Sequence, residues 1–432
     1  MAATGTVERL VGSYNAWATN GASRAPAWLK ELRSGGIERF AELGFPNMKQ
    51  EAWRFTNVAP IAEGSFEPAK APSRIPTLDE IRPYLLLEAG PRLVFVDGFF
   101  QPTLSTPFFD DVQSLAHVVT HRPDLVRQHL GKYAVTQDRP FSALNTAFVH
   151  DGAFVHVAPK ATVELPIQLL LLATGAHPVV IHPRNLVVVE REARVSIVET
   201  YATLKDGVYW TNAVTEIAVG DGARVDYHRV QREGARAYHV ATTQSHQGRD
   251  STLNVHFVAF GGALARHDIG SVMAGPGGTL ILNGLYLLAG QQHADHHTTI
   301  DHAADHCESH EYFNGVLDEK SRGVFTGRII VRPGAQKTDS KQTNNNLLLS
   351  TDAHADSQPQ LEIYADDVKC THGSTVGPLD PRSLFYLKSR GIGADEARRL
   401  LTYGFAAEIL GRMQVAPLRE QLDRVVRSRL AE

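Results

Sequence analysis

The stretch that decides the fold is VVVEREARVSIVETYATLKDGVYWTNAVTEIAVGDGARVDYHRV, residues 187–230. Short runs rich in valine, isoleucine and tyrosine follow one another, and only brief turns of glycine and charged residues separate most of them. Such runs are typical of strands, because β-branched and aromatic side chains pack well on a pleated surface. No helical period interrupts them, so the stretch predicts strand after strand.

The same alternation continues from about residue 145 to LEIYADDV at 361–368, and some of its turns resemble one another. PKATV, REARV and DGARV place an alanine at 161, 193 and 223, with spacings of 32 (193−161) and 30 (223−193). A loose repeat of short strands favours a β-solenoid, and NNN at 344–346 then suits a polar ladder at a coil corner. A β-sandwich is the alternative, because it also has short strands and regular turns.

Helical patterning flanks the strands. Apolar residues recur at helical spacing from Val7 to Trp17, and GG at 35–36 is expected to interrupt the helices that follow. Near the other end, Asp380-Pro381 is a suitable start for a helix. We therefore predict a mainly β protein with an N-terminal helical domain (1–140), a solenoid core (141–378) and a C-terminal helical domain (379–432).

Composition excludes several classes of function. A net charge of −4 over 432 residues gives no basic field for a nucleic acid. The N-terminal residues lack the pattern of a secretory signal, and the longest apolar run, LPIQLLLLATG, is much shorter than the roughly 20 residues that span a membrane. The two cysteines, Cys307 and Cys370, cannot form a disulfide framework, which favours a cytoplasmic protein. Two thiols are also fewer than the four that usually hold an iron–sulfur cluster.

The motif YADDVKCTHGSTVG, residues 364–377, places Cys370 two residues before His372. Alternate side chains of a strand share a face, so the two would point the same way, roughly 7 Å apart. That spacing suits a shared metal and suits a buried row equally well. It is too long for a Cys–His nucleophile pair, which needs hydrogen-bond contact.

Histidines gather in QQHADHHTTIDHAADHCESHEY, residues 291–312. Imidazole binds zinc, copper and iron, but the spacing matches no compact zinc motif. On a strand, His296 and His302 would share one face and His297 the other, so most of these histidines are expected on solvated or interfacial strands, with one or two as metal ligands. GPGG at 275–278 lacks the Lys-Ser/Thr that completes a phosphate loop, so no nucleotide site is predicted.

Two long strings make a family recognisable. DEKSRGVFTGRIIVRPGAQKTDSKQTNNNLLLS (318–350) and PQLEIYADDVKCTHGSTVGPLDPRSLFYLKSRGI (359–392) resemble the SufB/SufD family of iron–sulfur cluster assembly scaffolds. The resemblance covers about 290–410, and NMKQEAWRFTNV at 47–58 is similar to the SufD branch. It implies a right-handed parallel β-helix flanked by helical domains, and a non-catalytic subunit that pairs with a SufB-like paralogue and docks a SufC-like ABC ATPase.

The resemblance also implies a site. His372, in the family's CxHG element, is the candidate metal ligand of a transient cluster shared with the partner, and Cys370 matches a family position beside it. The C-terminal stretch resembles the helices that dock the ATPase, which points to Phe385, Leu387, Leu401 and Phe405. The family's link to reduced flavin has no signature in this chain, so flavin stays open for the complex, as does a homodimer for the chain alone.

Two other functions remain as alternatives. A metalloenzyme would use the histidines of 293–310 on a β-helix or a β-sandwich. A carbohydrate-acting β-helix is disfavoured, because such enzymes are usually exported and no signal peptide is visible.

Overall fold

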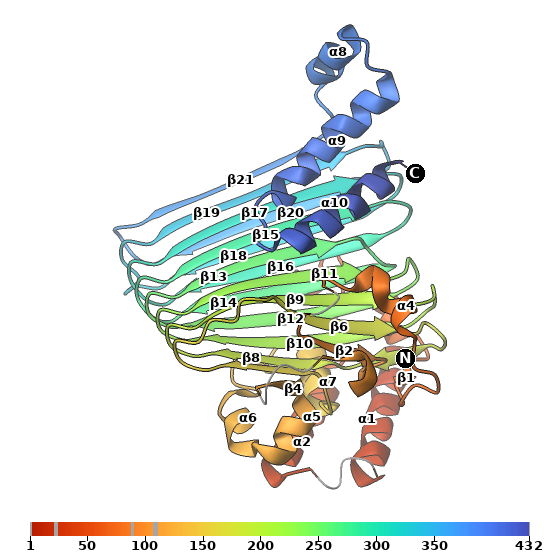
Figure 1. The fold of residues 1–432 in the computed structure, drawn as a ribbon, viewed down its shortest axis with the longest axis vertical. Helices are drawn as coiled ribbons and strands as arrows, with labels where there is room; N and C mark the ends of the chain where they lie inside the picture. Colours follow the sequence, from red (N-terminus) through yellow and green to blue (C-terminus); the bar gives the residue numbers. More distant parts are fainter. Residues whose placement is uncertain (1, 21–24, 88–89, 107–110, 432) are drawn as a thin grey trace.

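The computed structural model describes residues 2–20, 25–87, 90–106 and 111–431. Within them the strands wind into a parallel β-solenoid of about 8 turns, with helical regions before and after it. Figure 1 shows the turns stacked along the long axis of the molecule. Successive turns pair in parallel and in register, which confirms the solenoid and excludes the β-sandwich.

Each full turn adds one strand to each of two sheets, which face each other across a filled lumen. Sheet A contains β4 (Val112–Ser114), β5 (Ala153–Val157), β8 (Arg184–Val189), β10 (Trp210–Val219), β12 (Tyr238–Gln247), β14 (Leu264–Met273), β16 (His293–His302), β18 (Arg322–Val331) and β20 (His354–Ile363), with β1 (Glu67–Pro68) and β7 (Val179–Ile181) at its side. Sheet B contains β3 (Phe99–Phe100), β2 (Arg92–Val96), β6 (Ile167–Ala173), β9 (Arg194–Thr203), β11 (Arg224–Arg232), β13 (Thr252–Ala259), β15 (Thr279–Leu288), β17 (Glu308–Leu317), β19 (Asp339–Leu348) and β21 (Lys369–Gly377).

A recurring corner explains the repeated alanines. A residue with left-handed backbone, such as Glu192 (φ 59°) or His306 (φ 57°), precedes a small side chain that points inward. Ala193, Ala223 and Cys307 fill this inward position and are fully buried. The N–H of Glu192 donates to the carbonyl of the next corner, as does the N–H of His306. Cys307 is therefore a packing residue of the repeat.

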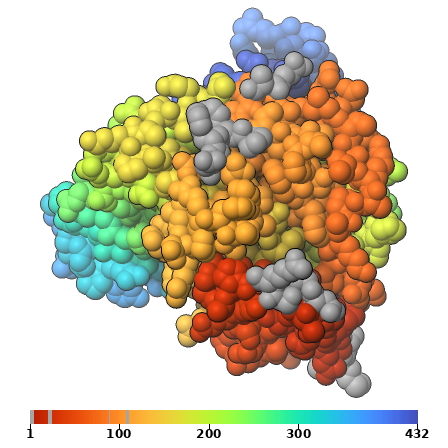
Figure 2. All heavy atoms as spheres, turned by 60° about the horizontal axis from the view of Figure 1, so that its bottom comes forward, coloured from red at the N-terminus to blue at the C-terminus, as the bar shows by residue number. Residues whose placement is uncertain are grey.

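The N-terminal helices are α1 (Ala2–Asn20), α2 (Ala27–Leu43), α3 (Ala59–Ala62), α4 (Leu78–Ile81), α5 (Leu115–His121), α6 (Pro123–His129) and α7 (Pro140–Ala147). Most of them cover the outer face of sheet A at the first turns, whereas Ile81 of α4 packs on β2, β6 and β9 of sheet B. Phe40 and Phe141 pack against Trp210 and Val240 of sheet A. Figure 2 shows these residues, red to orange, spread over the end of the molecule where the solenoid begins.

The helix α2 continues through Gly35-Gly36, so the predicted interruption there is wrong. Gly36 lies directly against α7, where a Cβ would come within 2.7 Å of the backbone nitrogen of Ala147. The glycine serves close helix packing and does not end the helix.

Three helices follow the last strand: α8 (Pro381–Ser389), α9 (Ala394–Leu410) and α10 (Ala416–Ala431). Asp380 caps α8 as expected, since its carboxylate accepts the N–H of Arg382 at 3.0 Å. Helices α9 and α10 bury Ile409, Leu418 and Leu422 against the outer face of sheet B, whereas α8 projects away from the solenoid. In the part of the chain described, no helix is both long and apolar enough to cross a membrane.

A buried charge network fastens the segment 47–58 to sheet A. Arg266 of β14 donates to Asp295 of β16 at 2.7 Å and to the carbonyl of Ala52 at 2.7 Å, and its guanidinium lies 3.7 Å from the ring centroid of Trp53. Thr56 donates to Asp295 at 2.5 Å. The adjacent Arg266 holds the pKa of Asp295 far below its usual range, in spite of its burial.

Replacing Arg266 with Met should loosen this segment, because Asp295 is then left as a buried charge without its cation. We expect the opening free energy of residues 47–58 to fall by roughly 3 kcal/mol, as measured by amide hydrogen exchange. The control is Arg236→Met, which breaks an exposed pair with Asp206 and should change stability by about 1 kcal/mol or less. Equal exchange in the two variants would contradict the anchoring role.

Candidate functional site

The solenoid ends on two strands that have a neighbour on one side only. In the sheet orders of the described residues, β20 is the last strand of sheet A and β21 the last strand of sheet B. Ile363, Tyr364 and Val376 in this last turn are exposed at 41%, 61% and 47%. A row of unpaired backbone groups beside exposed apolar side chains is a template for adding another chain's strand.

Cys370 and His372 lie on this last strand and face the lumen side. Cys370 pairs in register with Ser340 of β19, and His372 pairs with Gln342. Ser340 and Gln342 are both buried at 1% exposure inside the solenoid, so the residues stacked on them point the same way. The predicted common face of Cys370 and His372 is therefore confirmed.

The two side chains differ in exposure. His372 is exposed, while Cys370 is half-buried and packs against the end of the solenoid core. Burial, and then the charge of Asp339, raises the pKa of the Cys370 thiol. Ser374 of the same strand donates to Ser357 of β20 at 2.8 Å and so joins the ends of the two sheets.

A row of polar side chains leads inward from His372. Gln342 lies behind it, and Glu311 of β17 lies behind Gln342 in the same register. The amide nitrogen of Gln342 donates to Glu311 at 2.5 Å. Glu311 is buried at 2% exposure, and this burial raises its pKa to about 7.

A second row leads inward from Cys370. Ser340 stands behind it and shares a hydrogen bond of 2.8 Å with Ser309, and Ser309 bonds the Nε2 of His302 at 2.8 Å. Burial lowers the pKa of His302 to about 4, so its imidazole is neutral near pH 7. Behind each of the two candidate ligands of the last turn, a row of hydrogen-bonded polar side chains therefore extends into the solenoid.

The histidines of residues 291–312 do not gather at one place in the fold. His296 and His302 point into the lumen and are fully buried, which corrects the expectation of solvated positions for these two. His293 bonds Thr56 at 3.2 Å and His297 lies 3.1 Å from Asp295, both in the network that holds the N-terminal segment. Among the described residues, no group of three or more His, Cys, Asp or Glu side chains is placed to hold a metal ion.

The asparagines of 344–346 lie within β19 and not at a corner, so that prediction is wrong. Asn344 and Asn346 point into the lumen, where Asn346 donates to Asn344 at 2.7 Å and Tyr286 donates to Asn346 at 2.5 Å. Asn345 points outward and bonds Thr375 of the last strand at 2.7 Å.

The four candidate docking residues differ in how exposed they are. Phe385 of α8 is exposed at 74%, next to Tyr386 at 56%. Leu387 and Leu401 are half-buried, and Phe405 packs against the cluster between α9 and sheet B. Helix α8 therefore presents the exposed aromatic surface, and Phe405 attaches its neighbour to the solenoid.

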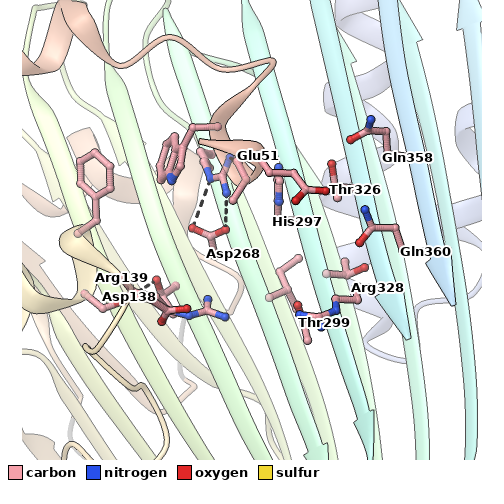
Figure 3. A pocket seen from close by; sticks show the side chains of 18 of the residues that line it. Glu51, Asp138, Arg139, Asp268, His297, Thr299, Thr326, Arg328, Gln358 and Gln360 are labelled. Atoms are coloured by element: carbon pink, nitrogen blue, oxygen red, sulfur yellow. Dashed lines mark hydrogen bonds and ion pairs between the residues drawn. The ribbon is translucent and has the colours of Figure 1, made fainter. Parts of the chain in front are cut away.

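A polar groove of about 740 Å³ crosses the outer face of sheet A and reaches the last turn (Figure 3). Its floor contains one in-register row that runs from β12 to β20: Thr242, Asp268, His297, Thr326 and Gln358. Residues 51–53 and 138–142 form its walls. Arg266 and Arg328 in the groove are paired with Asp268 and Glu362.

Sequence reasoning missed the groove and the polar rows, because their members come from separate turns. The in-register pairing that aligns Glu311, Gln342 and His372 is not visible in a single sequence. The available signal was alternation, since Ser340, Gln342 and Asn344 are polar residues at alternate positions of one strand.

Comparisons with known proteins agree with this architecture. The family model "SUF system FeS cluster assembly, SufBD core domain" matches residues 171–405, and the model of the SufBD N-terminal region matches 90–169. The chain belongs to the SufBD family. It is therefore an iron–sulfur cluster assembly protein.

Named relatives cover most of the chain. An iron–sulfur cluster assembly SufBD family protein of Synechocystis sp. is 33% identical over 415 residues, which are 93% of this chain and 91% of the relative. The iron–sulfur cluster assembly protein SufD of Escherichia coli is 30% identical over 398 residues, 89% of each chain. SufD of Bacillus subtilis is 29% identical over 423 residues, 93% of this chain and 94% of the relative. These similarities confirm the resemblance to SufD.

The buried Glu311 predicts a pH dependence of stability. Its pKa is about 7 in the folded chain against the ordinary 4.5 of a glutamate carboxyl, so the folded state binds the proton more tightly. Its contribution is favourable below about pH 4.5 and is lost as pH rises through 7, a change of about 3 kcal/mol.

Glu311→Gln should remove this dependence. We expect the stability of the variant, relative to the natural chain, to rise by about 3 kcal/mol between pH 4.5 and pH 8 in urea unfolding. Glu308→Gln, at an exposed position of the same strand, is the control and should show no such rise. A difference that is constant with pH would contradict the assigned burial of the Glu311 carboxyl.

Proposed function

We propose that this chain is a non-catalytic scaffold subunit that assembles iron–sulfur clusters jointly with a SufB-like paralogue and a SufC-like ABC ATPase. The observation that carries the proposal is the last turn, where Cys370 and His372 stand on a strand whose outer edge lacks a partner among the described residues. The same turn is thus an edge for strand pairing and a source of ligands.

The small number of cysteines supports a cluster site shared between two chains. An iron–sulfur cluster usually has four thiolate ligands, and this chain has two cysteines. Cys307 is fully buried at a solenoid corner, which leaves Cys370 and the imidazole of His372 at the last turn. The cluster is cargo on this account, and the paralogue supplies the remaining ligands. The free cysteines also favour the cytoplasm.

The partners are assigned to different surfaces. The paralogue pairs with the edges of β20 and β21, where backbone hydrogen bonds supply affinity and side chains supply specificity. The ATPase docks on α8, whose exposed Phe385 and Tyr386 fit an apolar pocket. ATP hydrolysis belongs to that partner, and reduced flavin is assigned no site on this chain.

His372→Ala tests the cluster site. We expect the cluster content of the complex, measured as iron, sulfide and visible absorption after expression in cells, to fall at least tenfold while native mass spectrometry still finds all three proteins. The matched control is His310→Ala, an exposed imidazole of β17 outside the last turn, which should load normally. Normal loading in the His372 variant would remove it from the site.

Phe385→Asp tests the docking surface. A buried aromatic anchor at an interface contributes about 2 kcal/mol or more, so the affinity for the ATPase should fall roughly 30-fold or more, as measured by calorimetry. Val135→Asp, an equally drastic change at a residue exposed at 54%, is the control and should leave the affinity unchanged. Equal affinities in the two variants would place the ATPase elsewhere.

A further inference from the structure

An amide oxygen directly behind His372 is buried and has no hydrogen-bond partner among the described residues. It is Oε1 of Gln342, a side chain with 1% exposure. Buried polar atoms are nearly always hydrogen-bonded, so this exception marks an acceptor that a neighbouring side chain can reach by rotating. The neighbour that can donate to it stands on the next strand.

The hydrogen bond to Glu311 orients this amide, and the space at a glycine of the facing sheet sets its position. Its nitrogen donates to Glu311 at 2.5 Å, and above about pH 7, where this carboxyl is ionised, Glu311 accepts hydrogen bonds but donates none. On the facing sheet, Gly327 leaves the space that the amide fills, since a Cβ there would come within 2.2 Å of the Gln342 nitrogen. The nitrogen is thus committed to Glu311, and the oxygen is the group that is left to accept.

His372 is placed to donate to that oxygen. It pairs in register with Gln342 on the adjacent strand, and both side chains point to the lumen side. Neighbouring strands lie about 4.8 Å apart, a distance that an imidazole and an amide can span with a hydrogen bond. A neutral imidazole has one N–H and one lone pair, and a hydrogen bond from the N–H fixes which nitrogen is free.

We propose that Gln342, held by Glu311, is a positioning residue for His372: its amide oxygen accepts the imidazole N–H and leaves the other ring nitrogen free at the open end. Outer partners of this kind orient the histidines that bind metals. The role of the free nitrogen as an iron ligand rests on the proposed function. The hydrogen bond itself does not.

In the neighbouring row, the side chain directly behind Cys370 is already hydrogen-bonded. Ser340, behind Cys370, already shares its hydroxyl with Ser309, which in turn bonds His302. The arrangement at Gln342 is therefore specific to the position behind the imidazole.

Ring-nitrogen NMR of the full chain tests the proposal without any cluster. With ¹⁵N-labelled histidine near pH 8, His372 is identified as the signal missing in His372→Gln. We expect His372 to occupy one tautomer in the natural chain and to populate both in Gln342→Met, which keeps the side-chain shape without an acceptor. Gln360→Leu, at the half-buried position on the outer face of the last turn, should leave the single tautomer intact.

Cluster loading separates this inference from the proposed function. In the complex, Gln342→Met should lower iron loading roughly 10- to 100-fold. If His372 populates both tautomers in the natural chain as well, the positioning role is overturned, even where His372→Ala abolishes loading. If His372 has a single tautomer that depends on Gln342, but the His372→Ala complex still loads iron normally, the hydrogen bond is supported and the proposed role of His372 as a cluster ligand is contradicted. Should Gln342→Met unfold, the signal of the natural chain alone decides the first question.

Discussion

Parallel, in-register hydrogen bonding between successive turns is the constraint on which the rest of this structure depends. Each interior strand satisfies its backbone groups with the strand of the turn before and the turn after, so the strands at either end of the stack are left with one edge that only another segment can pair. The N-terminal helices pack over the first turns. At the other end, α9 and α10 cover the outer face of sheet B, and the edges of β20 and β21 stay open.

Register also turns distant residues into rows. A side chain on one strand stands directly before its counterpart in the next turn, about 4.8 Å away. Glu311, Gln342 and His372 become one line in this way, although some thirty residues of chain separate each from the next. Some polar residues of the lumen bond one another, as Ser309 and Ser340 do. The chemistry at the last turn is thus prepared by the turns beneath it.

The sequence was sufficient for the solenoid, for the flanking helices and for the common face of Cys370 and His372, because each depends on local alternation. It failed at Gly35-Gly36 and at 344–346, because tertiary packing decided those positions: α7 lies against Gly36, and the lumen takes up Asn344 and Asn346. It could not find Gln342 or Glu311, since only the register of separate turns brings them behind His372. The division into three domains stays a prediction.

The account's central claim is that the edges of β20 and β21 pair with a second SufBD-family chain, and amide hydrogen exchange tests this most directly. The chain is compared alone and in complex with a SufB-like partner. The account predicts strong slowing over residues 354–377 in the complex, with little change in the interior strand β9, whose amides are already paired. Unchanged exchange over 354–377 in a complex that has demonstrably formed would contradict it.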